Sequence, residues 1–451
     1  MNQKNNKLGA RLWVSLLLIG MVGQIAWAIE NNYINLWVFS QSHNTDHINW
    51  MTSGSAVVAT ITTFLVGAWS DLKGKRKIFI SVGYTIWGLF VFLFGVMSLP
   101  NMESVFGVGS ANAVLFVGIM NLIVDCVMTF FGSMGNDAAF SAFVTDKTNE
   151  KNRPFVESAL SVMPLLALAL MMLVGMALGI PDSSKSPGEI AGPWFLFFLV
   201  FGALTSAIGV ASFFLLPKDN LVPTRDRHYW KQMFVGFLPR TVKENPLFYL
   251  SLLAFLCFNI AVDAFLPYFL VYFQGMESFA GMNFYLAFGI IMGLGALLTL
   301  LSGAFLTRFG KFAVLIPSAI LLSIGAIGLY FVQGQFVPCI VFGTILILGY
   351  LMGTSSLGAS LRDHTPKENV GAFQSVRMVF AVMLPMVIGS NISSLVFSST
   401  RVNDFGQVEK SPDRGMWIVV FAAAILSLIP IFFLLFQSKK RASLAKNSEE
   451  R

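Results

Sequence analysis

The chain has 451 residues, of which 55% are hydrophobic and 12% are charged, and its mean hydropathy is +0.71. Soluble proteins carry roughly 25% charged residues, so this composition excludes an ordinary water-soluble domain. The formal net charge of +7 does not indicate nucleic-acid binding, because that function gathers basic residues on one soluble face and the polar segments are too short to form one. The composition predicts a membrane protein.

Twelve apolar windows follow one another along the chain, each close to or longer than the about 20 residues that an α-helix needs to cross a bilayer. Only helices and closed barrels satisfy every backbone hydrogen bond in lipid, and the alternation typical of a barrel is absent. The sequence therefore predicts an all-α membrane protein with twelve transmembrane helices. The windows lie at 11–39, 48–70, 78–98, 111–143, 155–180, 193–216, 247–273, 281–305, 312–332, 335–360, 370–397 and 415–437.

The windows divide into a first six-helix bundle at 1–216 and a second at 247–437, joined by a polar linker at 217–246 and followed by a basic tail at 438–451. We expect the tail to be disordered. With both termini on one side, 25 of the 30 Lys and Arg residues fall on that side, and the positive-inside rule makes it cytoplasmic. We therefore expect a multi-pass protein of the cell membrane. The first apolar helix continues past Ala28, so we expect no signal-peptide cleavage.

A glycine and acidic motif lies between the second and third windows. Gly67 is followed by Asp71, Gly74, Lys75 and Arg76. The same spacing returns 236 residues later, with Thr307 in place of the aspartate, as Gly303, Thr307, Arg308 and Gly310. A repeat of this kind predicts two related halves with a ligand site near the middle of the membrane.

This motif resembles the loop signature of the major facilitator superfamily. The resemblance implies two pseudo-symmetric six-helix bundles that rock about a central substrate site. It also implies that the motif residues hold a gate, namely Gly67, Asp71, Gly74, Lys75, Arg76, Gly303, Arg308 and Gly310. The alternative is a basic loop that only sets the orientation of the chain in the membrane.

Two acidic residues lie deep inside apolar windows. Glu30 is about 11 residues, or roughly 16 Å, from the outer end of the first window, and Asp263 has a similar depth in the seventh. An ionisable group at that depth costs on the order of 2.5–3.5 kcal/mol or more unless it is paired or hydrated. We therefore expect both to bind substrate and to carry protons. The alternative is that each only ties helices together.

The residues around Glu30 suit a carbohydrate. Trp27 and Tyr33 recur at helical spacing, which brings an acid and aromatic faces to one side of the helix, and Asn31 adds an amide. Sugar C–H faces stack on aromatic rings while hydroxyl groups bond to carboxylates and amides. The alternative is an aromatic stripe that serves packing.

The fourth window has a polar residue at every fourth position, which forms one ridge of a helix. Within it, Asn136 and Asp137 are our second candidate for a substrate or proton site. Arg377 lies in the eleventh window, where it could neutralise Asp137 or Glu157, hold an anionic substrate group, or extend to the inner surface. The ridge consists of Asp125, Thr129, Ser133, Asp137, Ser141 and Thr145.

The segment from Gly135 to Arg153 resembles the glycoside–pentoside–hexuronide cation symporters. That resemblance implies carboxylates on spans 1, 2 and 4 and a basic residue on span 11 that serve sugar and cation. Glu30, Asp125 or Asp137, and Arg377 occupy three of these places. The second span departs from the pattern because 49–70 contains no acidic residue. This argues against a sodium site of the family type and favours protons carried by Glu30, Asp137 or Asp263.

No enzyme motif is present: there is no nucleophile elbow, phosphate loop or zinc-ligand spacing. The three cysteines lie inside windows, and we expect all four histidines in loops. We therefore expect no catalytic residue, cofactor or metal. The predicted function is proton-coupled uptake of a sugar or glycoside by a monomer in the lipid bilayer. The alternatives are a drug or lipid exporter, and a membrane sensor or assembly partner that transports nothing.

Overall fold

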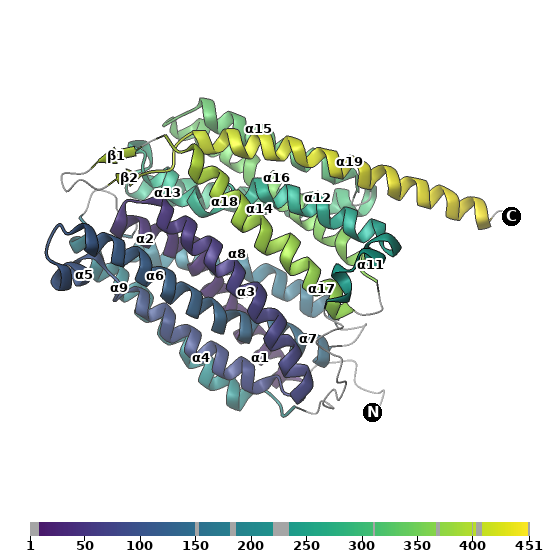
Figure 1. Cartoon of the computed structure of the whole chain (residues 1–451), viewed down its shortest axis with the longest axis horizontal. Helices are drawn as coiled ribbons and strands as arrows, with labels where there is room; N and C mark the ends of the chain where they lie inside the picture. The colour runs from purple at the N-terminus through teal and green to yellow at the C-terminus, as the bar shows by residue number, and fades with distance from the viewer. Residues whose placement is uncertain are drawn as a thin grey trace. The chain divides into compact units, whose positions relative to one another are not determined.

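The computed structural model describes residues 9–148, 153–180, 186–219, 234–309, 312–366, 370–398, 400–402 and 408–449 (Figure 1). The chain forms two compact units. Unit 1 consists of Met1–Arg227 with Thr400–Lys410, and unit 2 of His228–Ser399 with Ser411–Arg451.

Unit 1 is built from long helices, two of which continue through π-helical turns. The first span runs through α1, η1 and α2 without a break, and the fourth through α6, η2 and α7. The elements are α1 (Ala10–Ala28), η1 (Ile29–Ile34), α2 (Asn35–Ser42), α3 (Thr45–Lys73), α4 (Lys77–Phe94), α5 (Leu99–Phe106), α6 (Ala111–Gly132), η2 (Ser133–Phe140), α7 (Ser141–Lys147), α8 (Arg153–Leu178) and α9 (Pro187–Leu215).

Unit 2 repeats this helical plan after a short 3-10 turn and a surface helix in the linker. Its elements are η3 (Val235–Phe237), α11 (Pro239–Glu244), α12 (Pro246–Asp263), η4 (Leu266–Tyr268), α13 (Phe269–Gln274), η5 (Glu277–Phe279), α14 (Met282–Phe309), α15 (Phe312–Phe331), α16 (Phe336–His364), α17 (Val370–Met378), η6 (Val379–Met383), α18 (Leu384–Val396) and α19 (Gly415–Glu449).

The expected fold class is confirmed. Among the described residues, eleven helices are long and apolar enough to cross a membrane, and α8 occupies the remaining window at 155–180. One expectation was wrong, because the segment after 437 is not disordered but continues α19 to Glu449. Once a helix is established, each further residue that is fixed adds one hydrogen bond, so extending a helix is easier than starting one.

The histidines do not all lie in loops, as the sequence suggested. His47 is 3% exposed in the first turn of α3, and His364 is the last residue of α16. His43 does lie in a turn, with a φ of 47°, and His228 falls outside the described residues. Polarity misled the prediction because a helix that begins or ends near the membrane surface can include polar residues in its first or last turn.

Small residues let the helices of unit 1 approach closely, as is common in membrane bundles. A Cβ atom added to Gly88 of α4 would lie 2.3 Å from the carbonyl oxygen of Gly202 on α9. The hydroxyls of Ser81 and Ser212 are 2.7 Å apart across the same pair of helices. Gly67 of the loop motif differs, because no atom lies within 4 Å of the position of its added Cβ.

A small antiparallel hairpin joins unit 1, although the chain reaches it from α18 and leaves it into α19. Its strands are β1 (Thr400–Val402) and β2 (Val408–Lys410). The Lys410 backbone N–H donates to the His43 carbonyl at 3.1 Å, and the Lys410 ammonium pairs with Asp46 at 3.1 Å. Strands of three residues are too short to leave a pattern in the sequence.

Candidate functional site

Three π-helical turns mark the spans that carry the predicted site residues. Glu30 lies in η1, Asn136 and Asp137 lie in η2, and Arg377 precedes η6 by two residues. Such turns are rare and often occur at functional sites. They add a residue to a helical turn, so they change which side chains share a face.

Glu30 is buried against the fourth span and is 8% exposed. The Thr129 hydroxyl donates to one oxygen of the Glu30 carboxylate at 2.9 Å. The other oxygen, Oε2, is buried and has no hydrogen-bond partner among the described residues. The described residues therefore donate fewer hydrogen bonds to Glu30 than a fully ionised carboxylate can accept.

A second carboxylate faces Glu30. Asp125 on α6 is 1% exposed, interacts electrostatically with Glu30, and has a buried Oδ1 without a partner. Ser55 of α3 lies within hydrogen-bonding reach of Asp125. None of the ion pairs seen among the described residues involves either acid. The two carboxylates thus form a buried pair that no cation among the described residues neutralises.

Asp125 was not among the substrate-binding or proton-coupling residues that we assigned. It did belong to the polar ridge of the fourth span, and it was the alternative to Asp137 for the fourth-span carboxylate that the symporter resemblance implies. The first three members of that ridge are buried, and Thr129 provides the hydrogen bond to Glu30. The available signal was therefore the i, i+4 spacing itself, which places Asp125 one turn from Thr129 on the same side.

Asp137 forms a second cluster with Trp27 and Asn136. Its carboxylate accepts from the Ser133 hydroxyl and from the Asn136 amide, each at 3.1 Å, and it is hydrogen-bonded to Trp27. The side-chain oxygen of Asn136, Oδ1, accepts from the Tyr84 hydroxyl at 2.8 Å. The structure thus brings together three of the predicted substrate-binding residues.

Tyr33 and Asn31 lie apart from this cluster. Tyr33 is 2% exposed and stacks on Phe197, with ring centroids 4.9 Å apart. Trp27 instead packs on Trp87 at 4.9 Å. Trp27 and Tyr33 were expected to share one face of the helix, but they contact different neighbours because η1 rotates the helix between them. Asn31 is exposed, and its amide donates to the Trp27 carbonyl at 2.9 Å.

In unit 2, Asp263 ends α12 where the span changes into a 3-10 turn. It interacts electrostatically with Tyr350 of α16. One turn earlier, the Asn259 amide donates to the Ala381 carbonyl in η6 at 2.9 Å. Asp263 therefore lies at an interruption of its helix, as Glu30 does in unit 1. Arg377 is exposed near the end of α17.

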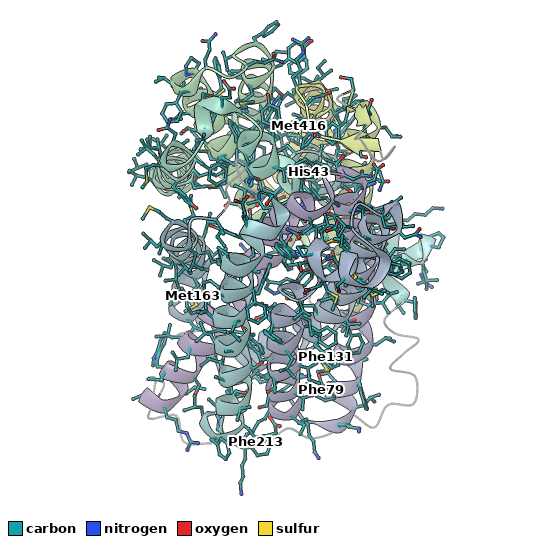
Figure 2. The ribbon with its side chains drawn as sticks, turned by 90° about the vertical axis from the view of Figure 1, so that its left-hand side faces the viewer. His43, Phe79, Phe131, Met163, Phe213 and Met416 are labelled. Atoms are coloured by element: carbon teal, nitrogen blue, oxygen red, sulfur yellow. The ribbon has the colours of Figure 1, made fainter. Side chains whose placement is uncertain are left out.

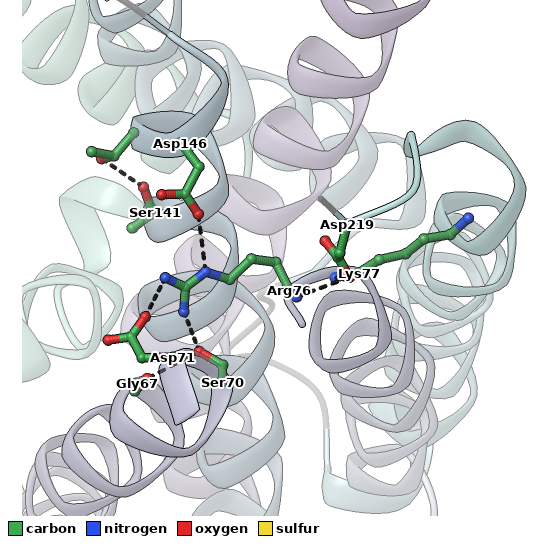
Figure 3. Close-up of polar contacts among 9 residues, drawn as sticks. Gly67, Ser70, Asp71, Arg76, Lys77, Ser141, Asp146 and Asp219 are labelled. Carbon is green, nitrogen blue, oxygen red and sulfur yellow. Dashed lines mark hydrogen bonds and ion pairs between the residues drawn. The ribbon is translucent and has the colours of Figure 1, made fainter. Parts of the chain in front are cut away.

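The first loop motif forms a network of charges (Figure 3). The buried Arg76 guanidinium pairs with Asp71, bonds to the Ser70 hydroxyl, and pairs with Asp146 at 3.1 Å. The backbone N–H groups of Arg76 and Lys77 donate to one Asp219 oxygen at 3.1 and 3.2 Å. Asp219 thus compensates the positive end of the α4 dipole.

The glycines and the charged residues of this loop have different structural roles. Gly74 ends α3 with a φ of 61°, a left-handed conformation that favours glycine, and Lys75 is exposed. In the second copy of the motif, Gly303 and Arg308 lie in the backbone of α14. The side chain of Arg308, and all of Gly310, fall outside the description.

The described side chains of these clusters do not form a metal site. No group of three or more His, Cys, Asp or Glu side chains that could hold a metal occurs in the described part of the chain. The site groups are carboxylates, amides, hydroxyls and indole rings, which can bind hydroxylated molecules and exchange protons.

Solved structures of transporters share the fold. The D-xylose-proton symporter aligns with a TM-score of 0.69 and 12% identity, over 93% of this chain and 97% of that protein. The nucleoside transporter NupG gives 0.68 and 12%, over 94% and 99%. A bacterial homolog of the human lysosomal transporter Spinster gives 0.62 and 15%, over 95% and 96%. At these identities the likeness shows the fold alone.

No curated protein sequence matches the chain. The family model of the Major Facilitator Superfamily matches residues 12–390, which is most of the chain. Together with the membrane helices and the transporter folds, this match shows a multi-pass membrane transporter and not an enzyme. The chain belongs to the Major Facilitator Superfamily.

Proposed function

We propose that this chain is a secondary-active transporter that takes up a sugar or glycoside together with protons by alternating access. The observation that carries the proposal is the buried pair of Glu30 and Asp125, each with an oxygen that has no hydrogen-bond partner among the described residues. Two neighbouring carboxylates are costly to ionise together in a membrane interior. A proton that one of them takes up relieves that cost.

The substrate part of the proposal rests on the cluster of Trp27, Asn136 and Asp137. An indole face, an amide and a carboxylate can stack on a sugar ring and bond to its hydroxyls. Asp263 and Arg377 are the corresponding candidates in unit 2. Two solved structures of the same fold are described as a D-xylose-proton symporter and a nucleoside transporter, whose substrates both contain a sugar ring.

Orientation and gating complete the proposal. The excess of Lys and Arg on one side of the spans supports cytoplasmic termini in the cell membrane. Asp71 and Arg76 hold the loop after α3, and we assign the first motif a role in closing the cytoplasmic gate. We expect the carrier to function as a monomer.

Purified protein in proteoliposomes is expected to accumulate a carbohydrate when the outside is made acidic, because protons that move down their gradient drive uptake. D-Xylose, D-galactose, a methyl galactoside and uridine form the first panel, and a protonophore must abolish the accumulation. Extrusion of amphiphilic drugs without any carbohydrate uptake would instead establish the exporter. Absence of flux for every compound would favour a sensor or assembly partner.

Asp125→Asn is expected to reduce proton-driven accumulation strongly while exchange of substrate across the membrane continues. Loss of this carboxylate removes the like charge beside Glu30, which is half of the proposed proton site. Glu277→Gln, which neutralises an exposed acid in η5, is the matched control. Unchanged accumulation in Asp125→Asn would leave Glu30 without its proposed partner.

A further inference from the structure

A cavity of about 300 Å³ lies within unit 1 between α1, the η2 to α7 segment, and α8. Its polar lining consists of Gln24, Asn136, Ser141 and Thr145, and its apolar walls include Phe140 and Met163. Met163 is labelled on α8 in Figure 2. Gln24 precedes Glu30 by six residues, so the cavity lies nearer to the N-terminal end of α1 than the carboxylate pair.

The described residues that line the cavity carry no charge. No Asp, Glu, Lys or Arg is among the described residues that border the cavity. Asp137 is adjacent to Asn136 in sequence, but it is not among the residues that border the cavity, and its two oxygens accept from Ser133 and Asn136. A charged ligand would therefore find no opposite charge among the described residues that border the cavity. Amides and hydroxyls both donate and accept, which matches a molecule with several hydroxyl groups.

Two amides have hydrogen-bonding capacity left. Asn136 accepts from Tyr84 and donates to Asp137, which uses one hydrogen of its NH₂ group and one lone pair of its oxygen. The Gln24 side chain is half-buried, and no hydrogen bond seen among the described residues involves it. A polar group held in a cavity without a protein partner must bond to water or to a ligand.

The size of the cavity limits the ligand. Small-molecule sites span roughly 300–1,000 Å³, so this one is at the lower end of the range. With a liquid volume of about 30 Å³ for each water molecule, it offers the space of about ten waters. A single hydroxylated ring fits within that space.

We propose that this cavity binds a neutral, single-ring polyhydroxy molecule through the Gln24 and Asn136 amides, with Gln24 setting affinity. The inference rests on the proposed function, since it assigns a binding position to the transported sugar. Ring faces contact Phe140, and hydroxyl groups replace the water that otherwise satisfies Gln24. Glu30 and Asp125 carry the proton outside this cavity.

The first test is the effect of Gln24→Leu on substrate exchange. Leucine keeps the approximate size of the side chain but removes the amide. Loss of one neutral hydrogen bond should raise the half-saturation concentration roughly three- to tenfold, with the maximal rate and the pH dependence retained. Gln24→Asn, which keeps a shorter amide, should have a smaller effect. An unchanged half-saturation concentration in Gln24→Leu would overturn the proposal.

The second test observes occupancy directly. Thr145→Cys is made in a chain whose three native cysteines are replaced by serine, and D-xylose or D-galactose, whichever the wild type takes up, should slow its alkylation. Ser104→Cys, exposed on α5, should be labelled at the same rate with and without sugar. Equal labelling of Thr145→Cys in both conditions would overturn the cavity site, even if the wild type accumulates sugar. Failure of the wild type to take up any carbohydrate would count against the proposed function itself.

Discussion

Glu30→Gln is expected to abolish proton-driven accumulation while substrate exchange continues. Net uptake needs a group that binds a proton on one side of the membrane and releases it on the other, whereas exchange needs only the loaded carrier to reorient. The amide oxygen of glutamine can still accept from Thr129, as Glu30 does at 2.9 Å. The geometry should therefore persist while the titratable group is lost.

Gradient-driven uptake and counterflow, measured side by side over a range of external pH, test this expectation. The wild type should show pH-dependent accumulation and Glu30→Gln should show none, with counterflow similar in both. The double variant with Asp125→Asn should likewise show no accumulation and should keep the counterflow of Glu30→Gln, because the effects of residues that act as a unit are not additive. Intact accumulation in Glu30→Gln would move the proton role to Asp137 or Asp263.

The fold could be predicted because the length and apolarity of a membrane helix are written directly in the sequence. The windows around 48–70 and 335–360 correspond to α3 and α16 within a few residues. The failures occur where tertiary contacts decide. The hairpin of β1 and β2 depends on Lys410 meeting Asp46 and His43, which are more than 360 positions away in the sequence.

The candidate site was predicted only in part. The depth of Glu30 and the polar ridge of the fourth span indicated the two helices on which the pair of Glu30 and Asp125 lies. The sequence assumed regular turns, however, and the π-helical segment η1 separates Trp27 from Tyr33. It also could not show that Asp125 faces Glu30, or that Gln24 borders a cavity, because each depends on how two helices are rotated against each other. Such rotations follow from packing that a single helix does not encode.

Arg76→Ala is expected to lower the stability of unit 1 substantially. The guanidinium is 8% exposed and contacts Asp71 and Asp146, whose side chains are 31% and 24% exposed. Removal of one partner from a buried ion pair costs roughly 3–5 kcal/mol, and exposed pairs are worth at most about 1 kcal/mol. Because the carboxylates of Asp71 and Asp146 are partly hydrated, we expect Arg76→Ala to lower the free energy of unfolding by about 2–3 kcal/mol.

The substitution also leaves two carboxylates facing each other across the end of the bundle, where Arg76 held Asp71 of α3 near Asp146 of α7 (Figure 3). The end of α3 should separate from α7 as a result. Cysteines introduced at the exposed position Lys73 should then be alkylated faster, and the temperature of half-denaturation in detergent should fall. Arg76→Lys should recover only part of the stability, because lysine lacks the planar group that reaches several acceptors at once.

The Lys75→Ala variant distinguishes a role of the Arg76 ion-pair network from a simple effect of positive charge on membrane orientation. It removes the same charge from the same loop, yet Lys75 is exposed, so its loss should barely change stability. Asp71→Asn should be intermediate, because Arg76 retains Asp146 and Ser70; we also expect it to loosen the cytoplasmic gate and to raise cysteine accessibility from that side. If Arg76→Ala and Lys75→Ala prove equally stable and equally active, the loop contributes only positive charge, and neither the network nor the gate is needed to explain the motif.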